Sequence, residues 1–280
     1  MLAPLVTAIV AAYNEERHIA ECLDSLRRQS YAPLEVTVAD DGSRDGTAAV
    51  VERFPEVRLL RRSHQGKAPA VNAAAAEARG EILLFLDGDL VYESGYVAAL
   101  VGPIAAGEEI GTSHATEFVG NPENRWARCL QARSGLPPDR RLVLTRREIA
   151  EGSIVYRAIR RADFLRVGGF DDIGYLDDQT LFPKIGRRAR FVPEAVCRHY
   201  NPERLGEVFA TGVWAAHSIL HLHGPKALFT YCPPLALVRA LGAGFSARSI
   251  DRFVYQCVSD WGVFRGLLAR VWRGRRRRLA

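Results

Sequence analysis

Cysteine pairs with the spacing of a zinc site or of a disulfide framework are missing from this sequence. The five cysteines are scattered, odd in number and never in a C-x-x-C spacing, which is typical of a protein from a reducing compartment. We therefore expect a cytoplasmic protein. The apolar start, MLAPLVTAIVAAYNEE, has neither a basic leader nor a separate cleavage region, so we interpret it as a first strand and not as a signal peptide.

Two further absences exclude other classes. No G-x-G-x-x-G motif follows the first apolar run, which argues against a dinucleotide-dependent oxidoreductase. The segment ALFTYCPPLALV is too short to cross a membrane, is broken by Pro233-Pro234 and is followed by Arg239, whereas a spanning helix needs about 20 largely apolar residues. With 280 residues, 48% of them hydrophobic, the chain can nevertheless bury a substantial core.

The positive charge is confined to the end of the chain. The net charge is +6, and six arginines without an acidic residue lie between Arg270 and Ala280, so the rest of the chain is neutral. Such a run is either a solvated end or a contact for anionic lipid headgroups or nucleic acid. Because the run lacks interleaved aromatic residues and the remaining chain is neutral, we expect no nucleic-acid partner.

Short apolar runs alternate with helical patterns over the first 90 residues. This alternation predicts βαβ units and a mostly parallel sheet with helices on both faces. Further along, we expect an excursion from the core over 118–150, a strand over 154–156, a short helix over 162–167, and a helix whose apolar face begins at Leu205. The expected strands near the start are 5–12, 34–40, 57–62 and 81–87, and the expected helices are 19–26, 46–54 and 68–78.

Polar clusters follow three of the predicted strands directly. They are Tyr13 to Glu16, Asp40 to Asp45, and Asp87-Gly88-Asp89. Ligands of open parallel sheets bind beyond the carboxyl ends of the strands, so these clusters predict one site. Two carboxylates separated by glycine can hold a divalent cation that accepts the oxygens of a diphosphate, although a capped turn uses the same residues.

Adjacent carboxylates end the second predicted strand. One of the two residues Asp40 and Asp41 can cap the helix that follows. The other is left over, and an ionised carboxylate there can accept the ring N–H of a pyrimidine base or ribose hydroxyls. The pair therefore predicts a nucleoside contact in addition to a helix cap.

The ordered combination of these motifs resembles glycosyltransferase family 2, the inverting nucleotide-sugar transferases with a GT-A fold. The resemblance runs from about residue 4 to residue 100, through VTAIVAAYNEE, VADDGSRDGT, HQGKA and FLDGD. It resumes in VGGFDDIGYLDDQTLFPKIGRRARFVPEAVCRH, roughly residues 167 to 199. It implies a Rossmann-like α/β fold with a GT-A domain over 1–223, divided into a nucleotide-binding half over about 1–100 and an acceptor half over about 101–223.

The resemblance also implies roles for individual residues. It implies that Tyr13, Glu15 and Lys67 line the nucleotide pocket and that Asp41 faces the base. Asp87 and Asp89 correspond to the family's DxD pair, with Asp89 on Mg²⁺ or Mn²⁺ and Asp87 nearer the ribose or sugar. His199 corresponds to a position where related enzymes place a histidine near the metal, although a lone histidine is often a structural, hydrogen-bonded residue.

Asp177-Asp178 stands where the family has Glu-Asp, so the resemblance implies that Asp178 is the catalytic base. A base carboxylate removes the proton of an acceptor hydroxyl that attacks the anomeric carbon, which inverts it in one displacement. The donor would be a UDP-, GDP- or dTDP-sugar, and the acceptor a lipid-linked glycan, a polysaccharide or a cell-envelope glycoconjugate. The alternative is a non-catalytic nucleotide-binding or scaffold protein that retains the fold; it would be expected to lose Asp178 or the DxD pair.

The last segment, 224–280, predicts an amphipathic helical extension with a basic tail. It mixes Trp and Phe with basic residues, which is typical of helices that lie in a membrane interface. One hypothesis is peripheral attachment to the inner face of the cell membrane. The other is a helical pair packed on the domain or in the interface of a homodimer.

Overall fold

The computed structural model describes residues 3–278 and divides into two compact units. We call them the sheet unit, made of Met1–Gly120, Asp139–Asp172 and Asp177–Tyr200, and the helical unit, made of Asn121–Pro138, Ile173–Leu176 and Asn201–Ala280. The residues after Tyr200 therefore belong to the helical unit. The boundary predicted between residues 223 and 224 concerns the extent of the family domain and stays a prediction.

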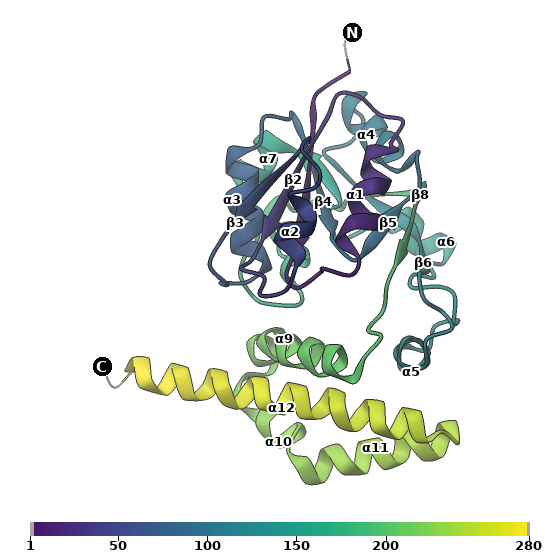
Figure 1. Cartoon of the computed structure of the whole chain (residues 1–280), viewed down its shortest axis with the longest axis vertical. Helices are drawn as coiled ribbons and strands as arrows, with labels where there is room; N and C mark the ends of the chain where they lie inside the picture. Colours follow the sequence, from purple (N-terminus) through teal and green to yellow (C-terminus); the bar gives the residue numbers. More distant parts are fainter. Residues whose placement is uncertain (1–2, 279–280) are drawn as a thin grey trace. The chain divides into compact units, whose positions relative to one another are not determined.

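One sheet organises the sheet unit (Figure 1). Over the described residues its strand order is β3-β2-β1-β4-β7-β6-β8-β5. Neighbours are parallel from β3 to β4 and between β6 and β8, whereas β7 and β5 run antiparallel to their neighbours. The strands are β1 (Val6–Ala12), β2 (Leu34–Asp40), β3 (Val57–Arg61), β4 (Ile82–Asp87), β5 (Leu90–Tyr92), β6 (Gly111–Val119), β7 (Ala158–Arg160) and β8 (Arg190–His199).

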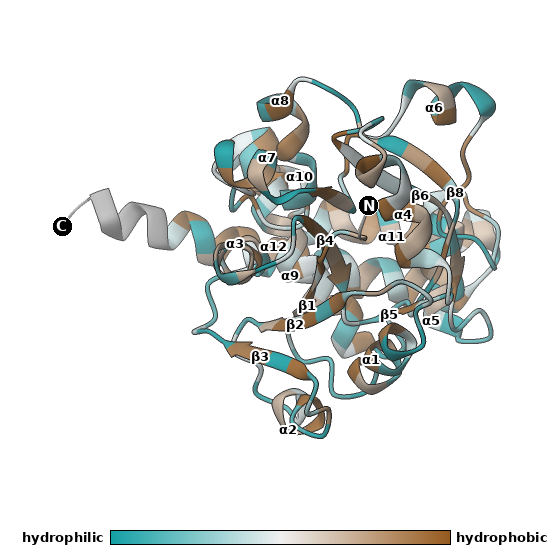
Figure 2. Ribbon diagram, turned by 90° about the horizontal axis from the view of Figure 1, so that it is seen from above, coloured by the Kyte–Doolittle hydropathy of each residue, from teal (hydrophilic) through white to brown (hydrophobic). Residues whose placement is uncertain are grey.

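Helices bury both faces of this sheet, and β1 and β4 are correspondingly hydrophobic along most of their length (Figure 2). Successive side chains of β1 point to opposite faces: Val10 packs in the apolar cluster of α1 and α4, and Ile9 in the cluster of α3 and α7. The helical segments of the sheet unit are α1 (Ile19–Arg27), α2 (Thr47–Val51), α3 (Lys67–Glu77), α4 (Tyr96–Ala105), α6 (Arg146–Glu151), α7 (Arg161–Arg166), η1 (Asp177–Gln179) and α8 (Leu181–Ile185).

The helical unit is organised by a close crossing of two helices. At Gly212 of α9, an added Cβ would lie 2.5 Å from the carbonyl oxygen of Ser259; at Gly262 of α12, it would lie 2.3 Å from that of Phe209. Only glycine therefore fits where these backbones meet. The helices of this unit are α5 (Arg125–Ser134), α9 (Leu205–His223), η2 (Gly224–Lys226), α10 (Ala227–Thr230), α11 (Pro233–Ala247) and α12 (Ile250–Arg278).

Most elements predicted from the sequence are confirmed, with two corrections. The strand predicted over 154–156 is wrong, because the strand in this region is β7, Ala158–Arg160, while Tyr156 turns its ring into the core. The segment 118–150 is not wholly an excursion either, since Trp126 and Cys129 of α5 are buried in an apolar cluster. The helices predicted over 162–167 and from Leu205 are present as α7 and α9.

No single helix of the described residues is long and apolar enough to cross a membrane. The segments Leu205–Thr230 and Pro233–Ala247 reach that length and composition only when taken together, across a bend of 90°.

Candidate active site

The register of the parallel strands aligns three polar segments at one edge of the sheet. Ala12, the last residue of β1, pairs with Asp40 at the end of β2, and Ala11 pairs with Asp87 at the end of β4. The chain leaves all three strands at the same level, so Tyr13 to Glu16, Asp41 to Asp45 and Gly88-Asp89 follow at the same edge. The convergence predicted from the sequence is confirmed for these segments.

Asp87 is held between two cations. Its Oδ1 accepts a hydrogen bond from Nζ of Lys67, and its Oδ2 lies 3.0 Å from Nη1 of Arg157. Burial would raise the pKa of Asp87, but Lys67 and Arg157 outweigh it and hold that pKa well below the usual range. Burial likewise opposes the charge of Lys67, and Asp87 nevertheless raises the pKa of Lys67. The three side chains are charged and mostly buried.

Asp89 faces His199 across an antiparallel strand pair. Leu90 of β5 pairs with His199 of β8, so the residue before β5 meets the end of β8. Asp89 Oδ2 lies 3.1 Å from Nε2 of His199, and Glu117 Oε1 lies 2.7 Å from Nδ1. Burial and Arg141 lower the pKa of His199, but Asp89 and Glu117 outweigh them and raise it to about 9. His199 is therefore both hydrogen-bonded and adjacent to the DxD pair.

The donor atoms of Asp89 and His199 suit a divalent cation. A carboxylate oxygen from the turn between β4 and β5 and an imidazole nitrogen from the end of β8 converge, and both side chains retain some exposure. Mn²⁺ accepts oxygen and imidazole ligands together, whereas Mg²⁺ favours oxygen alone. The residues present therefore fit a divalent cation. Both oxygens of Asp87 already bind protein cations, so Asp87 is the poorer ligand of the pair.

The two carboxylates of the Asp177-Asp178 pair have different environments. Asp177 is buried, and burial together with Asp178 and Asp87 raises its pKa to about 6 despite the opposing effect of Lys67. Asp178 is partly exposed. Both lie on η1 beside a cavity of about 10 Å³, which is room for about one water molecule. The cavity is lined by Lys67, Val71, Phe85, Leu86, Tyr156, Arg157, Phe170, Asp177 and Asp178.

The carboxylate of Asp41 is hydrogen-bonded to the segment that follows β3. Its Oδ1 accepts the backbone N–H of Gln65 at 2.8 Å, and its Oδ2 accepts that of Gly66 at 2.9 Å and lies 2.8 Å from Nδ1 of His64. The ring of His64 stacks on Tyr13 with centroids 4.2 Å apart. Asp40, by contrast, accepts the N–H of Ser43 at 3.0 Å and closes a turn. The helix cap predicted for one of the pair is wrong, because α2 begins only at Thr47, after Gly46.

Hydrogen bonds join the loops after β1 and β2. The backbone N–H of Glu15 donates to Oγ1 of Thr47 at 2.8 Å, and the N–H of Gly46 donates to Oε2 of Glu16 at 2.9 Å. An added Cβ at Gly46 would lie 2.7 Å from the Glu16 side chain, so a larger residue there would move this carboxylate. Glu15 is thus positioned by its backbone beside the α2 N-terminus, at the edge predicted for the nucleotide.

Two residues of this region were not predicted from the sequence. Arg157 comes just before β7 and Glu117 from β6, and neither lies near a recognised motif. Their positions depend on strands inserted between β4 and β8, in an order that the chain does not spell out. Arg157 adds a second cation to Asp87, and Glu117 adds a carboxylate behind His199.

Comparisons with known sequences agree with this geometry. Residues 7–168 match the family model described as glycosyl transferase family 2. The chain is 37% identical over 93 residues to the glycosyltransferase AglE of Haloferax volcanii, covering 31% of each protein. It is 32% identical over 124 residues to the chondroitin synthase of Pasteurella multocida, covering 43% of this chain and 13% of the synthase. The chain thus spans less than a third of these relatives' lengths.

Solved structures share the fold. The mannosyltransferase PcManGT from Pyrobaculum calidifontis, in complex with GDP-Man and Mn²⁺, has a TM-score of 0.60 and 24% identity, covering 96% of this chain and 88% of that one. Glucosyl-3-phosphoglycerate synthase from Mycobacterium tuberculosis, in complex with Mn²⁺, UDP and phosphoglyceric acid, has a TM-score of 0.52 and 23% identity, with 78% of each chain covered. With the matched sequence model over more than half of its length, the chain belongs to glycosyl transferase family 2 and has the GT-A fold.

Proposed function

We propose that the protein is a metal-dependent inverting glycosyltransferase that moves a sugar from a nucleoside-diphosphate sugar to an acceptor hydroxyl. The observation that carries the proposal is the convergence of Asp87, Asp89, His199 and Lys67 at the strand ends, with Asp178 beside Lys67 and Arg157 in the same unit. Carboxylates, cations and a candidate cation site are the groups that this reaction needs.

Asp178 is the proposed base. Its partial exposure lets an acceptor hydroxyl reach it, whereas Asp177 is buried and holds its proton to about pH 6. Removing the proton of the attacking hydroxyl leads to a single displacement, and no covalent intermediate on the protein is required. Lys67 and Arg157 supply fixed positive charge near the position proposed for the diphosphate, where negative charge develops as the sugar departs.

Asp89 and His199 are the proposed ligands of a Mn²⁺ or Mg²⁺ ion, which when bound stabilises the charge of the leaving diphosphate. Asp87 keeps Lys67 and Arg157 in place and lies nearer the ribose or sugar. Two neighbours of known structure support this arrangement, because PcManGT holds GDP-Man with Mn²⁺ and the mycobacterial synthase holds UDP with Mn²⁺.

Tyr13, Glu15 and Asp41 form the proposed nucleoside pocket. A base that uses Asp41 must displace the ring of His64 or the N–H groups of Gln65 and Gly66, which bind that carboxylate here. UDP, GDP and dTDP are the donor nucleotides to compare. The acceptor is proposed to be a lipid-linked glycan, a polysaccharide or a cell-envelope glycoconjugate, in line with relatives such as the chondroitin synthase.

Nucleotide binding gives the first test. The purified full chain is heated with UDP, GDP, dTDP or CDP, with and without Mn²⁺, and the unfolding midpoint is followed, since a ligand of the folded state raises it. We expect one nucleotide to stabilise the protein in a Mn²⁺-dependent way, and Asp89→Ala to abolish the Mn²⁺-dependent part. If no nucleotide raises the unfolding midpoint, the transferase proposal fails. If one nucleotide raises it but no sugar is transferred, the result supports the alternative of a non-catalytic nucleotide-binding protein.

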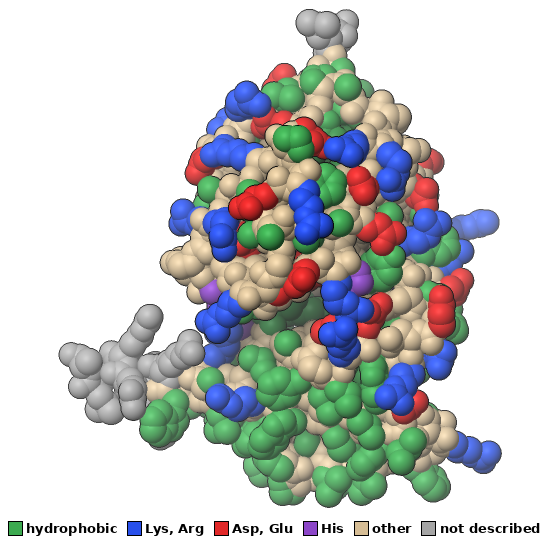
Figure 3. Space-filling model, viewed as in Figure 1, with side chains coloured by type: hydrophobic (Ala, Val, Ile, Leu, Met, Phe, Trp, Pro, Cys, Tyr) green, Lys and Arg blue, Asp and Glu red, His purple; other side chains and the backbone are tan. Residues whose placement is uncertain are grey.

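The helical unit carries a surface that supports peripheral membrane contact. Helix α11 contains one charged residue, Arg239, which is directed to Oδ2 of Asp260 at 3.0 Å. Hydrophobic side chains gather over α11 and α12 on the face seen in Figure 3. The exposed fractions include 89% for Phe245, 65% for Val238 and 55% for Leu241. Exposed helix faces in water normally carry charge, so this face is typical of an interaction surface.

Anionic lipid is the occupant that we propose for this face. Lys226 and Arg248 are exposed at the two ends of the α10–α11 segment, and Trp261 and Trp272 are exposed on α12. Apolar side chains that enter the headgroup boundary, flanked by cations and tryptophan, characterise interfacial helices. The arginine-rich end of the sequence adds charge of the same sign. The proposed location is the inner face of the cell membrane, where a lipid-linked acceptor would be within reach.

A vesicle flotation assay distinguishes membrane contact from the alternative, in which this face packs against protein. The full chain is mixed with phosphatidylglycerol-containing or neutral vesicles, beside a double variant Leu241→Asp with Phe245→Asp. We expect the wild-type chain to float with anionic vesicles and the double variant to stay behind. A wild-type chain that stays in the soluble fraction with both vesicle types contradicts membrane contact. If it also forms a dimer that the double variant cannot form, the face is a homodimer interface.

A further inference from the structure

A buried series of hydrogen bonds leads from His199 into the interior of the sheet unit. His199 Nδ1 lies 2.7 Å from Oε1 of Glu117, and Glu117 Oε2 lies 3.1 Å from Nε2 of His114. The other nitrogen of His114, Nδ1, lies 2.8 Å from the hydroxyl of Tyr96. Each carboxylate oxygen of Glu117 therefore holds a different imidazole, and the side chains become less exposed from His199 to His114.

Strand geometry places these residues on one face. Glu117 of β6 pairs with Cys197 of β8, so His199, two positions further along, points to the same side as Cys197. His114 is three positions from Glu117, and regular alternation would put these two on opposite faces. The β6–β8 pairing shifts register between His114 and Thr116, and this irregularity allows the two side chains to meet.

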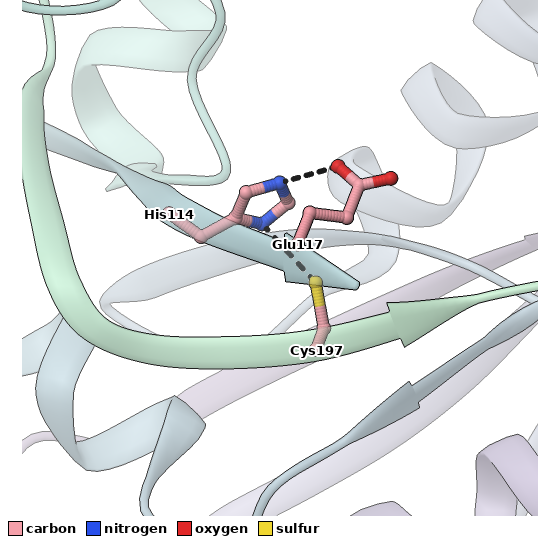
Figure 4. Close-up of side chains that lie close together, drawn as sticks. All are labelled: His114, Glu117 and Cys197. Carbon is pink, nitrogen blue, oxygen red and sulfur yellow. Dashed lines mark hydrogen bonds and ion pairs between the residues drawn. The ribbon is translucent and has the colours of Figure 1, made fainter. Parts of the chain in front are cut away.

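The same cluster offers the atoms of a metal site, and its geometry argues against one. His114, Glu117 and Cys197 bring ligand atoms within 4.8 Å of one another. Figure 4 shows the ring of His114 between the other two: Nε2 faces Glu117, while Nδ1 faces Sγ of Cys197 at 3.7 Å. One ion cannot take both nitrogens of a ring. Burial and Glu117 also raise the pKa of the Cys197 thiol, which keeps it protonated.

The protons along the series follow from its chemistry. Burial lowers the pKa of His114, so the ring is neutral and carries one N–H. The charged Glu117 can only accept, which assigns that N–H to Nε2 and leaves Nδ1 of His114 to accept from the hydroxyl of Tyr96. By the same argument, His199 donates its Nδ1–H to Glu117. The ring of His199 is then fixed with Nε2 directed at Asp89. Because the pKa of His199 is about 9, Nε2 also carries a proton in the metal-free protein, and a cation that binds Nε2 displaces that proton.

We propose that Glu117, supported by His114 and Tyr96, is a positioning residue that orients His199 and fixes its Nδ1–H, so that Nε2 is presented to a divalent cation beside Asp89. This inference rests on the proposed metal dependence and deepens it. Outer carboxylates that orient a ligand histidine change metal affinity by about 10- to 100-fold when they are removed. Glu117 Oε1 also accepts a hydrogen bond from Nε of Arg141 at 3.3 Å, and the proposal assigns its effect on the cation to the contact with His199.

Mn²⁺ affinity tests the proposal without an activity assay. Free Mn²⁺ is titrated by electron paramagnetic resonance into the full chain, the variant Glu117→Gln and the control Glu35→Gln, with and without UDP. Glu35 is a matched control, because it is a mostly buried strand carboxylate that binds Thr7 and Arg79 away from the site. We expect Mn²⁺ binding to weaken about 10- to 100-fold in Glu117→Gln and to stay unchanged in Glu35→Gln. Wild-type affinity in folded Glu117→Gln overturns the proposal.

Two further measurements keep the test decisive. If Glu117→Gln does not fold, Tyr96→Phe keeps the ring and removes only the distal hydroxyl; we expect a smaller loss of Mn²⁺ affinity, and an unchanged affinity contradicts the proposal. If the wild-type chain binds no Mn²⁺, the metal-dependent function fails. The positioning role is then decided by ¹⁵N spectra of the histidine rings in the metal-free protein. Above pH 9, where His199 carries one N–H, an N–H that lies on Nδ1 and moves to Nε2 in Glu117→Ala supports it, and a tautomer unaffected by Glu117→Ala overturns it.

Discussion

The candidate active site and the exposed face of α11 differ in where their charged and apolar side chains lie. At the strand ends, Asp87, Lys67 and Arg157 are mostly buried, and Asp87 binds both cations. On α11, Phe245 and Val238 are exposed without a charged neighbour on the same helix except Arg239, which is directed to Asp260. Charged side chains are therefore concentrated where water is scarce, whereas the exposed side chains of α11 are mostly apolar. Folding in water alone favours neither arrangement, which is the reason why a ligand is proposed for each region.

The largest effect is expected from the charge of the proposed base. Asp178→Asn removes the proton acceptor and keeps the side-chain volume, so kcat should fall by about a hundredfold to ten-thousandfold. The Mn²⁺-dependent stabilisation by nucleotide should be retained, because Asp178 is not a proposed ligand of either. Steady-state kinetics and thermal unfolding check the two halves. Full activity in Asp178→Asn would remove Asp178 from the mechanism.

Removing the central carboxylate should cost stability. Asp87→Asn leaves Lys67 and Arg157 without their shared partner, and an uncompensated buried charge lowers the free energy of unfolding by about 3–5 kcal/mol. Asp89→Asn is the control, since the more exposed Asp89 pairs with His199, and His199 keeps Glu117 when that pair is lost. Urea unfolding compares the two. Equal losses of unfolding free energy in the two variants would show that Lys67 and Arg157 do not depend on Asp87 as their partner.

The buried carboxyl of Asp177 should make stability depend on pH. Because its folded-state pKa is raised from 3.8 to about 6, the folded protein holds a proton that the unfolded chain releases. This contribution is complete below about pH 3.8 and is lost as the pH rises through about 6. Relative to the wild-type chain, Asp177→Asn should therefore gain up to about 3 kcal/mol between pH 4 and pH 8. Urea unfolding at the two pH values gives the difference, and parallel curves would place the titration elsewhere.

The smallest effect is expected on the uncharged face. Leu241→Asp with Phe245→Asp adds charge where side chains are already exposed, so the free energy of unfolding should change by only about 0.5 kcal/mol per site. The same change at Ala240, which is fully buried on this helix, should be strongly destabilising and serves as the contrast. A large loss from the exposed pair would mean that the face is already covered within the protein, for example in a dimer.

The sequence predicted the parts of the site that depend on local pattern. Asp40 and Asp87 end buried runs of parallel strands, and such ends meet at one edge, so their convergence follows from β1, β2 and β4 alone. The histidine at the end of β8 could be matched to its position by resemblance. The roles of Asp89, His199 and Asp178 remain proposals, although the structure places Asp89 and His199 in contact.

The parts that were missed depend on strand order. β7 has three residues and enters the sheet between β4 and β6, so neither its length nor an alternating pattern could place Arg157 beside Asp87. The apolar residues before it predicted a strand at 154–156, but this segment is irregular and buries the Tyr156 ring. Glu117 meets His114 only because the β6–β8 register shifts, and a pattern of alternating faces predicts the opposite.

The glycines of the α9–α12 crossing fix the rotational setting of α12. Gly262 and Gly266 lie one helical turn apart, and an added Cβ on either would collide with a backbone carbonyl oxygen of α9. A shift of α12 by one residue would rotate it by about 100° and bring Trp261, now 51% exposed, into the space of Gly262. The positions of these two glycines thereby decide which aromatic residues α12 can present outward, and a one-residue deletion between them would change which side chains beyond it face outward.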